Sequence, residues 1–111
     1  MDKEKLYDYL LRVGIKPHLV GFSYLLSIID LGLENPHDVY MTGLFIELER
    51  EFKKDKRGIE KAILTALNGA WKREEKRQFQ YMIFGDYKRP TVKEFVCASV
   101  KFLYYRKNLH F

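Results

Sequence analysis

Apolar residues recur at alternating steps of three and four along nearly the whole chain, and this spacing constrains the fold more than any other feature. Side chains three and four positions apart share one face of an α-helix, whereas a half-buried strand would alternate with a period of two. No convincing period of two, internal repeat or low-complexity linker occurs. We therefore predict a single compact all-α domain, residues 1–111, of about five or six helices.

Glycine and proline residues predict several helix boundaries. Gly14 ends the first helix, and Pro17 opens the second. The second helix ends before Pro36, because proline cannot continue a helix and disfavours helical backbone at the preceding residue. A short apolar segment before the last helix stops at Gly85. The inward stripe of the second helix is expected to be Leu19, Phe22, Leu26, Ile29 and Leu33.

The last helix has the clearest local signal. Thr91 and Glu94, directly after Pro90, have the spacing of a capping box, in which a hydroxyl and a carboxylate accept hydrogen bonds from exposed backbone N–H groups. Cys97, which has apolar neighbours, is expected to be a small core residue. The buried stripe of this helix is expected to comprise Phe95, Val96, Ser99, Phe102 and Leu103.

Composition and charge limit the function. The net charge of +5 favours a polyanionic partner. The one cysteine excludes an intrachain disulfide, and there is no Cys/His cluster of the kind that binds zinc. No signal peptide or membrane-spanning run is visible, which predicts a cytoplasmic protein with no membrane partner. No nucleophile motif, phosphate-binding glycine loop or convergent carboxylate pair occurs, so we expect no enzyme, cofactor, metal or small-molecule substrate.

The stretch "KKDKRGIEKAILTALNGAW", residues 53–71, predicts a helix with two unlike faces. At 100° per residue its apolar side chains fall in one arc, where three alanines let a neighbouring helix approach closely. The opposite arc has cations, a hydroxyl and an amide, with no carboxylate at its centre. The inner arc comprises Ile59, Ala62, Ile63, Ala66, Leu67, Ala70 and Trp71. The outer arc comprises Arg57, Lys61, Leu64, Thr65, Asn68 and Lys72.

A short connection joins this helix to the preceding one. Only about four residues, "KKDK", follow the expected helix end near Phe52, which is the length of a helix-turn-helix connection. The second helix of such a motif enters the major groove of double-stranded DNA, and side chains like those of the outer arc bond to base edges and phosphates. We predict base contacts from Arg57, Lys61, Thr65 and Asn68. We predict phosphate contacts from Lys53, Lys54, Lys56 and Lys72.

Three residues weaken the helix-turn-helix prediction. Two of them, Glu49 and Leu64, favour a competing interpretation, a protein-interaction module that has lost DNA reading and modulates another regulator. Glu49 stands where such motifs usually have a small residue, and Lys53 replaces the frequent turn glycine. Leu64 would be exposed on the outer arc unless it touches a thymine methyl group or another protein. An apolar patch around Leu64 would indicate a protein partner, whereas a continuous positive stripe would indicate DNA.

Five segments of the sequence occur in the order and nearly the spacing of a known family. They are "GIKPHLVGFSYLLSII", "LFIELEREF", "IEKAILTALNGAW", "FG" and "RPTVKEFVCASVKFL". From about Tyr7 to Tyr105 the chain resembles the C-terminal DNA-binding effector domain of stage-zero sporulation protein A, the response regulator of sporulation. The resemblance implies a six-helix domain with a helix-turn-helix that binds a short promoter box as tandem head-to-tail copies. It also implies that His18 makes a structural hydrogen bond at a helix start and has no catalytic or ligand role.

The resemblance also implies which positions read bases. The family uses a Glu, the Arg beside it and a second Arg one turn later on the second helix of the motif. By position these correspond to Glu60, Lys61 and Leu64. Lysine is a point charge and leucine offers no hydrogen bond, and losing one arginine fork removes about 1–3 kcal/mol of discrimination. The family's sequence preference is therefore not expected to transfer intact.

The sequence shows no receiver domain, the module whose phosphorylation promotes pairing of effector domains in the family. We therefore expect an effector domain that is constitutively competent, controlled by its abundance or regulated by another protein, and that pairs as a homodimer on tandem sites. A phage or mobile-element copy that interferes with a host regulator would combine DNA binding with the protein-interaction alternative.

Overall fold

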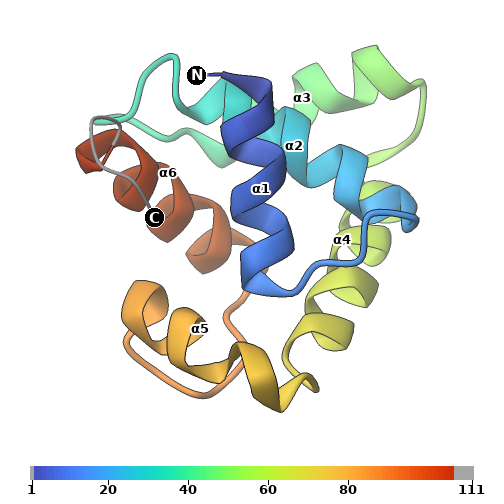
Figure 1. Ribbon diagram of the computed structural model, residues 1–111. Coiled ribbons are helices and arrows are strands. Elements are labelled where there is room, and N and C mark those ends of the chain that lie inside the picture. The colour runs from blue at the N-terminus through green and yellow to red at the C-terminus, as the bar shows by residue number, and fades with distance from the viewer. Residues whose placement is uncertain (1, 107–111) are drawn as a thin grey trace.

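The structure, a computed structural model, describes residues 2–106 and contains only helical elements within them. The helices are α1 (Lys3–Val13), α2 (Val20–Gly32), α3 (Met41–Phe52), α4 (Lys56–Ala70), α5 (Arg77–Phe84) and α6 (Val92–Tyr105), with a 3-10 turn at Glu74–Lys76. α2 lies at the centre and contacts α1, α3, α4 and α6, while α5 contacts α1 and α6 (Figure 1). The predicted all-α fold is confirmed.

The central helix α2 is buried on more than one side. Leu25, Ile28 and Ile29 have no exposed surface, and α2 contacts four other helices. Of the predicted stripe, Phe22 and Ile29 are buried, whereas Leu19, Leu26 and Leu33 pack against the core but are only half-buried. A helix at the edge of a core buries one stripe of apolar residues, whereas a central helix buries residues on several sides.

Local signals set most of the helix ends as predicted. Gly14 ends α1 with a φ of 109°, and Gly85 ends α5 with a φ of 68°, both in the left-handed region that glycine adopts at little cost. At the start of α6 the Thr91 hydroxyl accepts from the Glu94 N–H at 3.1 Å, and the Glu94 carboxylate accepts from the Thr91 N–H at 2.8 Å. The capping box is therefore confirmed.

The connection before α2 corrects one predicted boundary. α2 begins at Val20 and not at Pro17. The Leu19 N–H donates to the Lys16 carbonyl at 3.2 Å and closes a turn with Pro17 at its second position. The fixed φ of proline suits that turn position as well as a helix start. His18 is exposed in this turn, and its side chain forms no hydrogen bond with the described part of the chain, so the structural bond expected for it is absent.

A buried polar pair joins the first and last helices. The Tyr9 hydroxyl donates to the Ser99 Oγ at 2.8 Å, and the Tyr9 ring stacks on Phe102 with 5.7 Å between ring centres. Burial raises the pKa of the Tyr9 hydroxyl well above its ordinary value, and the hydrogen bond to Ser99 offsets only part of that rise. Ser99 was predicted to be inward and is fully buried, whereas Cys97 is half-buried and not the core residue expected.

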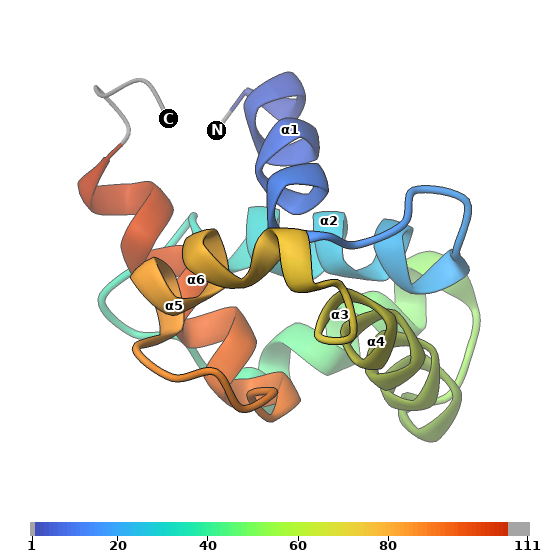
Figure 2. The same cartoon turned by 60° about the horizontal axis from the view of Figure 1, so that its bottom comes forward.

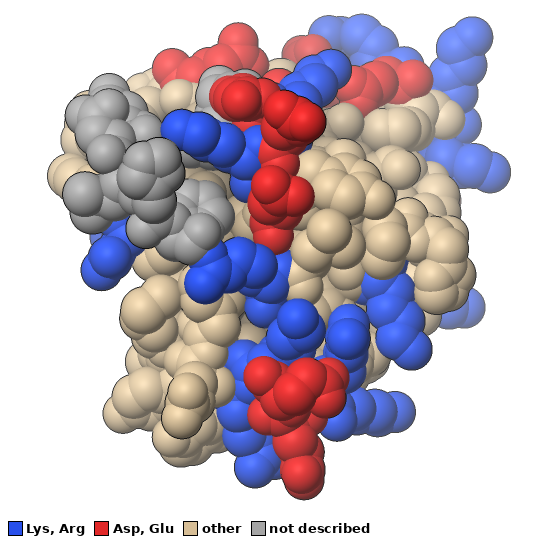
Figure 3. All heavy atoms as spheres, in the orientation of Figure 1, with Lys and Arg blue, Asp and Glu red and all other residues tan. Residues whose placement is uncertain are grey.

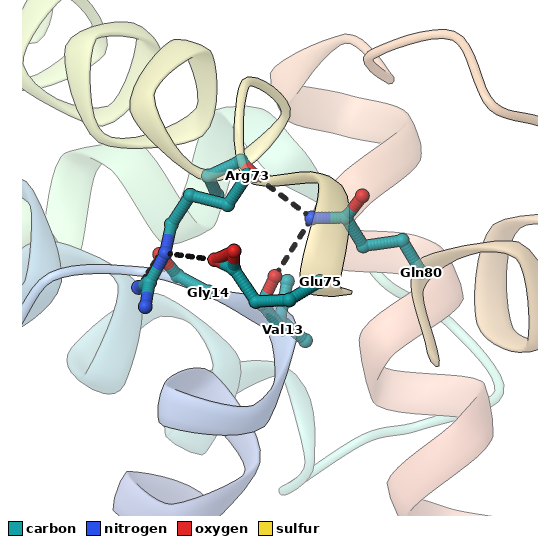
Figure 4. A network of polar contacts seen from close by, with 6 residues as sticks. Val13, Gly14, Arg73, Glu75 and Gln80 are labelled. Atoms are coloured by element: carbon teal, nitrogen blue, oxygen red, sulfur yellow. Dashed lines mark hydrogen bonds and ion pairs between the residues drawn. The ribbon is translucent and has the colours of Figure 1, made fainter. Parts of the chain in front are cut away.

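A buried amide links the C-terminal ends of α1 and α4 to α5 (Figure 4). The Gln80 Nε2 donates to the Val13 carbonyl at 2.8 Å and to the Ala70 carbonyl at 3.0 Å. Beside it, the Arg73 guanidinium donates to the Gly14 carbonyl at 3.1 Å. The last carbonyls of a helix lack partners within the helix. Side chains from the α4–α5 region therefore satisfy them and fix the end of α4 in place.

Candidate nucleic-acid interface

α3 and α4 form a helix-turn-helix with a short, capped turn. Lys53 ends α3 in the left-handed conformation, with φ 54° and ψ 45°. The Asp55 carboxylate accepts from the Gly58 N–H at 3.0 Å and caps α4. Lys56 lies in the first turn of α4, so the connection is Lys53–Asp55, one residue shorter than predicted.

The inner face of α4 packs closely on the start of α2. A Cβ added to Gly21 would lie 2.4 Å from the Ala62 carbonyl oxygen and 3.0 Å from the Ala66 Cβ. Small residues on both helices therefore allow the backbones to meet, as the alanines predicted. Two members of the predicted arc, Ala62 and Trp71, are only half-buried. The fully buried members are Ile59, Ile63, Ala66, Leu67 and Ala70.

The outer face of α4 is exposed to solvent. Figure 2 shows α4 at the edge of the molecule, with no other helix over its outer side. The Thr65 hydroxyl donates to the Lys61 carbonyl at 3.1 Å, so its oxygen faces outward as an acceptor. The exposed side chains along α4 and just beyond it are Arg57, Lys61, Thr65, Asn68 and Lys72. The exposed side chains of the turn and first helical residue are Lys53, Lys54 and Lys56.

The stretch that forms the turn and α4 has a net positive charge. Residues 53–72 contain six cations and two carboxylates, which gives +4 of the chain's net +5. Within residues 2–106 none of these six cations forms an ion pair. The Lys56 Nζ lies 5.4 Å from the centre of the Phe45 ring, which holds this lysine over α3. Figure 3 shows acidic side chains gathered over α1 and near the α4–α5 junction instead.

Two residues that the family resemblance aligned with base-reading positions are not fully exposed. Glu60 and Leu64 are half-buried, and Leu64 packs against the core. The expectation of an exposed apolar residue at Leu64 is therefore wrong. The outer face is centred on Lys61 and Asn68, and Leu64 lies on its flank, where it packs in part against the core.

The first turn of α2 lies beside α4, which sequence analysis missed. Leu19 and Val20 face Lys61 and Thr65 across a shallow groove. Val20 is 58% exposed, although it is an apolar residue. Placing the helix start at Pro17 concealed this neighbour. Gly21 and the alanines of α4 together could have indicated that the first turn of α2 packs closely against α4.

Two further features bear on the class of protein. Among residues 2–106, no group of three or more His, Cys, Asp or Glu side chains is arranged to hold a metal ion. No described helix has both the length and the apolar character that a bilayer crossing requires.

An exposed cationic helix, joined by a capped turn to a second helix and anchored on an apolar core, defines a helix-turn-helix DNA-binding domain. Residues 6–103 match the family described as the sporulation initiation factor Spo0A C terminal, and the chain belongs to this family. The family is one of DNA-binding transcription factor domains and not of enzymes. No curated protein and no solved structure gives a significant match to the chain.

Proposed function

We propose that this chain is a sequence-specific transcription regulator that lays α4 in the major groove of double-stranded DNA. The supporting observation is the outer face of α4, where cations and an amide are exposed without ion pairs among the described residues. In this kind of motif the N-terminal part of the second helix contacts bases. Arg57 and Lys61, one turn apart near that end, are the main base-reading pair, and Thr65 and Asn68 extend the contact along the groove.

The remaining residues of the interface have different roles. Glu60, half-buried beside Lys61, is placed to accept a hydrogen bond from a cytosine amino group. Leu64 supports α4 by packing and reads no base, so the DNA sequence bound differs from the one that two arginines would select. The phosphate contacts come from Lys53, Lys54, Lys56 and Lys72.

Salt dependence tests the phosphate contacts directly. If about five phosphates are neutralised, log affinity falls with log salt at a slope of roughly −4.5. Lys54→Ala is expected to weaken binding to all sequences alike and to reduce the slope by about 0.9. Lys101→Ala, at an exposed lysine of α6, is the matched control and should leave the slope unchanged. Fluorescence anisotropy with mixed genomic fragments measures all three proteins. A wild-type affinity that does not change with salt would refute DNA binding by this face.

Selection of bound genomic fragments tests sequence reading. The fragments recovered by the purified chain should share a common sequence, and Lys61→Ala should reduce the preference for it by about 1–3 kcal/mol. Lys61→Arg is the informative partner variant, because a guanidinium fork can bond bidentately to guanine where lysine cannot. Recovered fragments without a shared sequence would contradict a base-reading role.

Pairing on DNA is a separate part of the proposal. Two copies are expected to bind head to tail on tandem sites, as the family resemblance implies. Sedimentation of the chain on duplexes with one and with two selected sites measures the stoichiometry. The second copy should bind more tightly than the first, and equal affinities would refute pairing.

One observation weighs against the alternative of a protein-interaction module. An exposed apolar patch around Leu64 would favour that function, and Leu64 is half-buried against the core. The cations of α4 and of the turn before it are exposed, as DNA binding requires.

A further inference from the structure

The connection between α1 and α2 runs along one flank of the proposed reading helix. Gly14, at its beginning, lies beside the last turn of α4, where an added Cβ would be 3.5 Å from the Ala70 Cβ. Gly21, just past its end, lies against Ala62 near the middle of α4. Residues 15–20 therefore run beside the C-terminal half of α4, between these two contacts (Figures 1 and 2).

This connection also borders the outer face itself. Leu19 and Val20 form one wall of a shallow groove, and Lys61 and Thr65 form part of the other. Val20 exposes 58% of its surface there. Base-reading residues of the proposed interface and an exposed apolar side chain therefore share one groove.

The connection is rigid and positively charged. Pro17 fixes one backbone dihedral, and the hydrogen bond from the Leu19 N–H to the Lys16 carbonyl closes the turn. Lys16 and His18 are both exposed, and residues 15–20 contain no carboxylate. Within residues 2–106, Lys16 forms no ion pair. A lysine in a fixed turn loses less conformational entropy on binding than a lysine in a flexible loop.

The dimensions of DNA decide what such a flank would meet. The major groove is about 12 Å wide, and an α-helix with its side chains is about 10–12 Å across, so the helix fills the groove. A segment of the protein directly beside that helix therefore faces the sugar-phosphate backbone of the DNA strand that borders the groove. Its cations meet phosphates there, and an apolar side chain at the groove edge meets sugar carbons or thymine methyl groups.

We infer that the segment Lys16–Val20 is a second DNA-contacting element, in which Lys16 pairs with a phosphate and Val20 packs on a sugar or thymine methyl group. This inference rests on the proposed function, since it requires α4 to lie in the major groove. It adds an ionic contact and an apolar contact outside the helix-turn-helix.

The two contacts predict different changes in binding. Lys16→Ala should reduce the slope of log affinity against log salt by about 0.9, because one fewer counterion is released. Val20→Ala should lower affinity by roughly fifteenfold for the loss of two buried methyl groups, with the slope unchanged. Lys93→Ala, at an exposed lysine of α6, is the matched control for charge and should behave as wild type.

Anisotropy titrations of the full chain measure both, with duplex made from a selected genomic fragment. Circular dichroism melts first establish that the variants fold, which is expected because both side chains are exposed. A wild-type slope for Lys16→Ala overturns the phosphate contact, and wild-type affinity for Val20→Ala overturns the apolar contact. If wild type itself shows no salt-dependent binding, the proposed function fails and takes this inference with it. If wild type binds steeply and both variants match it, only the inference fails.

Discussion

Replacing Gly21 by alanine tests whether close packing on α2 sets the position of α4. The new Cβ would lie 2.4 Å from the Ala62 carbonyl oxygen, a backbone atom that cannot rotate away. Restoring an ordinary contact of about 3.5 Å requires the helices to separate by roughly 1 Å. Overpacking of this kind costs about 1–3 kcal/mol, against roughly 0.5–1 kcal/mol gained by removing a glycine from a helix. We expect a net loss of about 1–2 kcal/mol in the free energy of unfolding.

The assay is urea unfolding followed by the fluorescence of Trp71, the one tryptophan of the chain, which directly follows α4. Thermal melts should fall by roughly 4–8 °C, at about 4 °C per kcal/mol. Gly69→Ala is the matched control, because an added Cβ at this helical position meets no atom within 4 Å. It should gain about 0.5–1 kcal/mol from helix propensity alone.

A Gly21→Ala protein as stable as wild type would refute the packing argument, provided that Gly69→Ala shows the expected gain. DNA affinity gives a second measurement on the same variant. At a temperature where Gly21→Ala is folded, displacement of α4 should weaken binding to the selected sequence more than binding to mixed DNA. Equal losses on both would show that the position of α4 does not control base reading.

Three further changes test individual contacts. Gln80→Met keeps the volume but leaves the Val13 carbonyl without its donor, so unfolding free energy in urea should fall by about 1–3 kcal/mol. Tyr9 keeps its proton in the folded state, because burial raises its pKa above the ordinary value of about 10. Above that pH only the unfolded chain ionises Tyr9, so stability should fall by about 1.4 kcal/mol per pH unit, and Tyr9→Phe should lack this slope. Lys53→Gly relieves a left-handed backbone, so stability should rise by about 1 kcal/mol while the salt slope of DNA binding drops by about 0.9.

Each of these has a clear contrary result. A Gln80→Met protein that melts as wild type would mean that the Val13 carbonyl finds another donor. A Tyr9→Phe protein that loses stability above pH ~10 as steeply as wild type would assign the slope to other groups. A Lys53→Gly protein with lower stability would show that the lysine side chain contributes packing that outweighs its backbone strain.

The parts of the fold that sequence predicted well are those set by local chemistry. The ends at Gly14 and Gly85 follow from a backbone conformation that glycine adopts at little cost. The capping box of Thr91 and Glu94 needs only residues three apart. The exposed face of α4 also followed from spacing alone, because this helix packs on the core along one side.

The predictions that failed depended on tertiary contacts that spacing does not encode. α2 is enclosed by four helices, so its burial has no single stripe. Leu64 is half-buried because the flank of α4, and not only its centre, reaches the core. From the sequence, Gln80 would be a polar surface residue on a short helix. It is instead buried, and its hydrogen-bond acceptors lie 67 and 10 positions away in the sequence. Pro17 suits a turn as well as a helix start, and the sequence alone does not distinguish the two.

The amide of Gln80 also bears on how proteins of this shape can diverge. Its two hydrogen bonds join the C-terminal end of α4 to α1 and α5. A shift of α4 relative to these helices would therefore break hydrogen bonds to buried backbone carbonyls. A preference for a new DNA sequence is therefore easier to reach by replacing single side chains on the outer face of α4 while the helix keeps its position. Natural variation within such a lineage should accumulate at Lys61, Thr65 and Asn68 while position 80 keeps a hydrogen-bond donor.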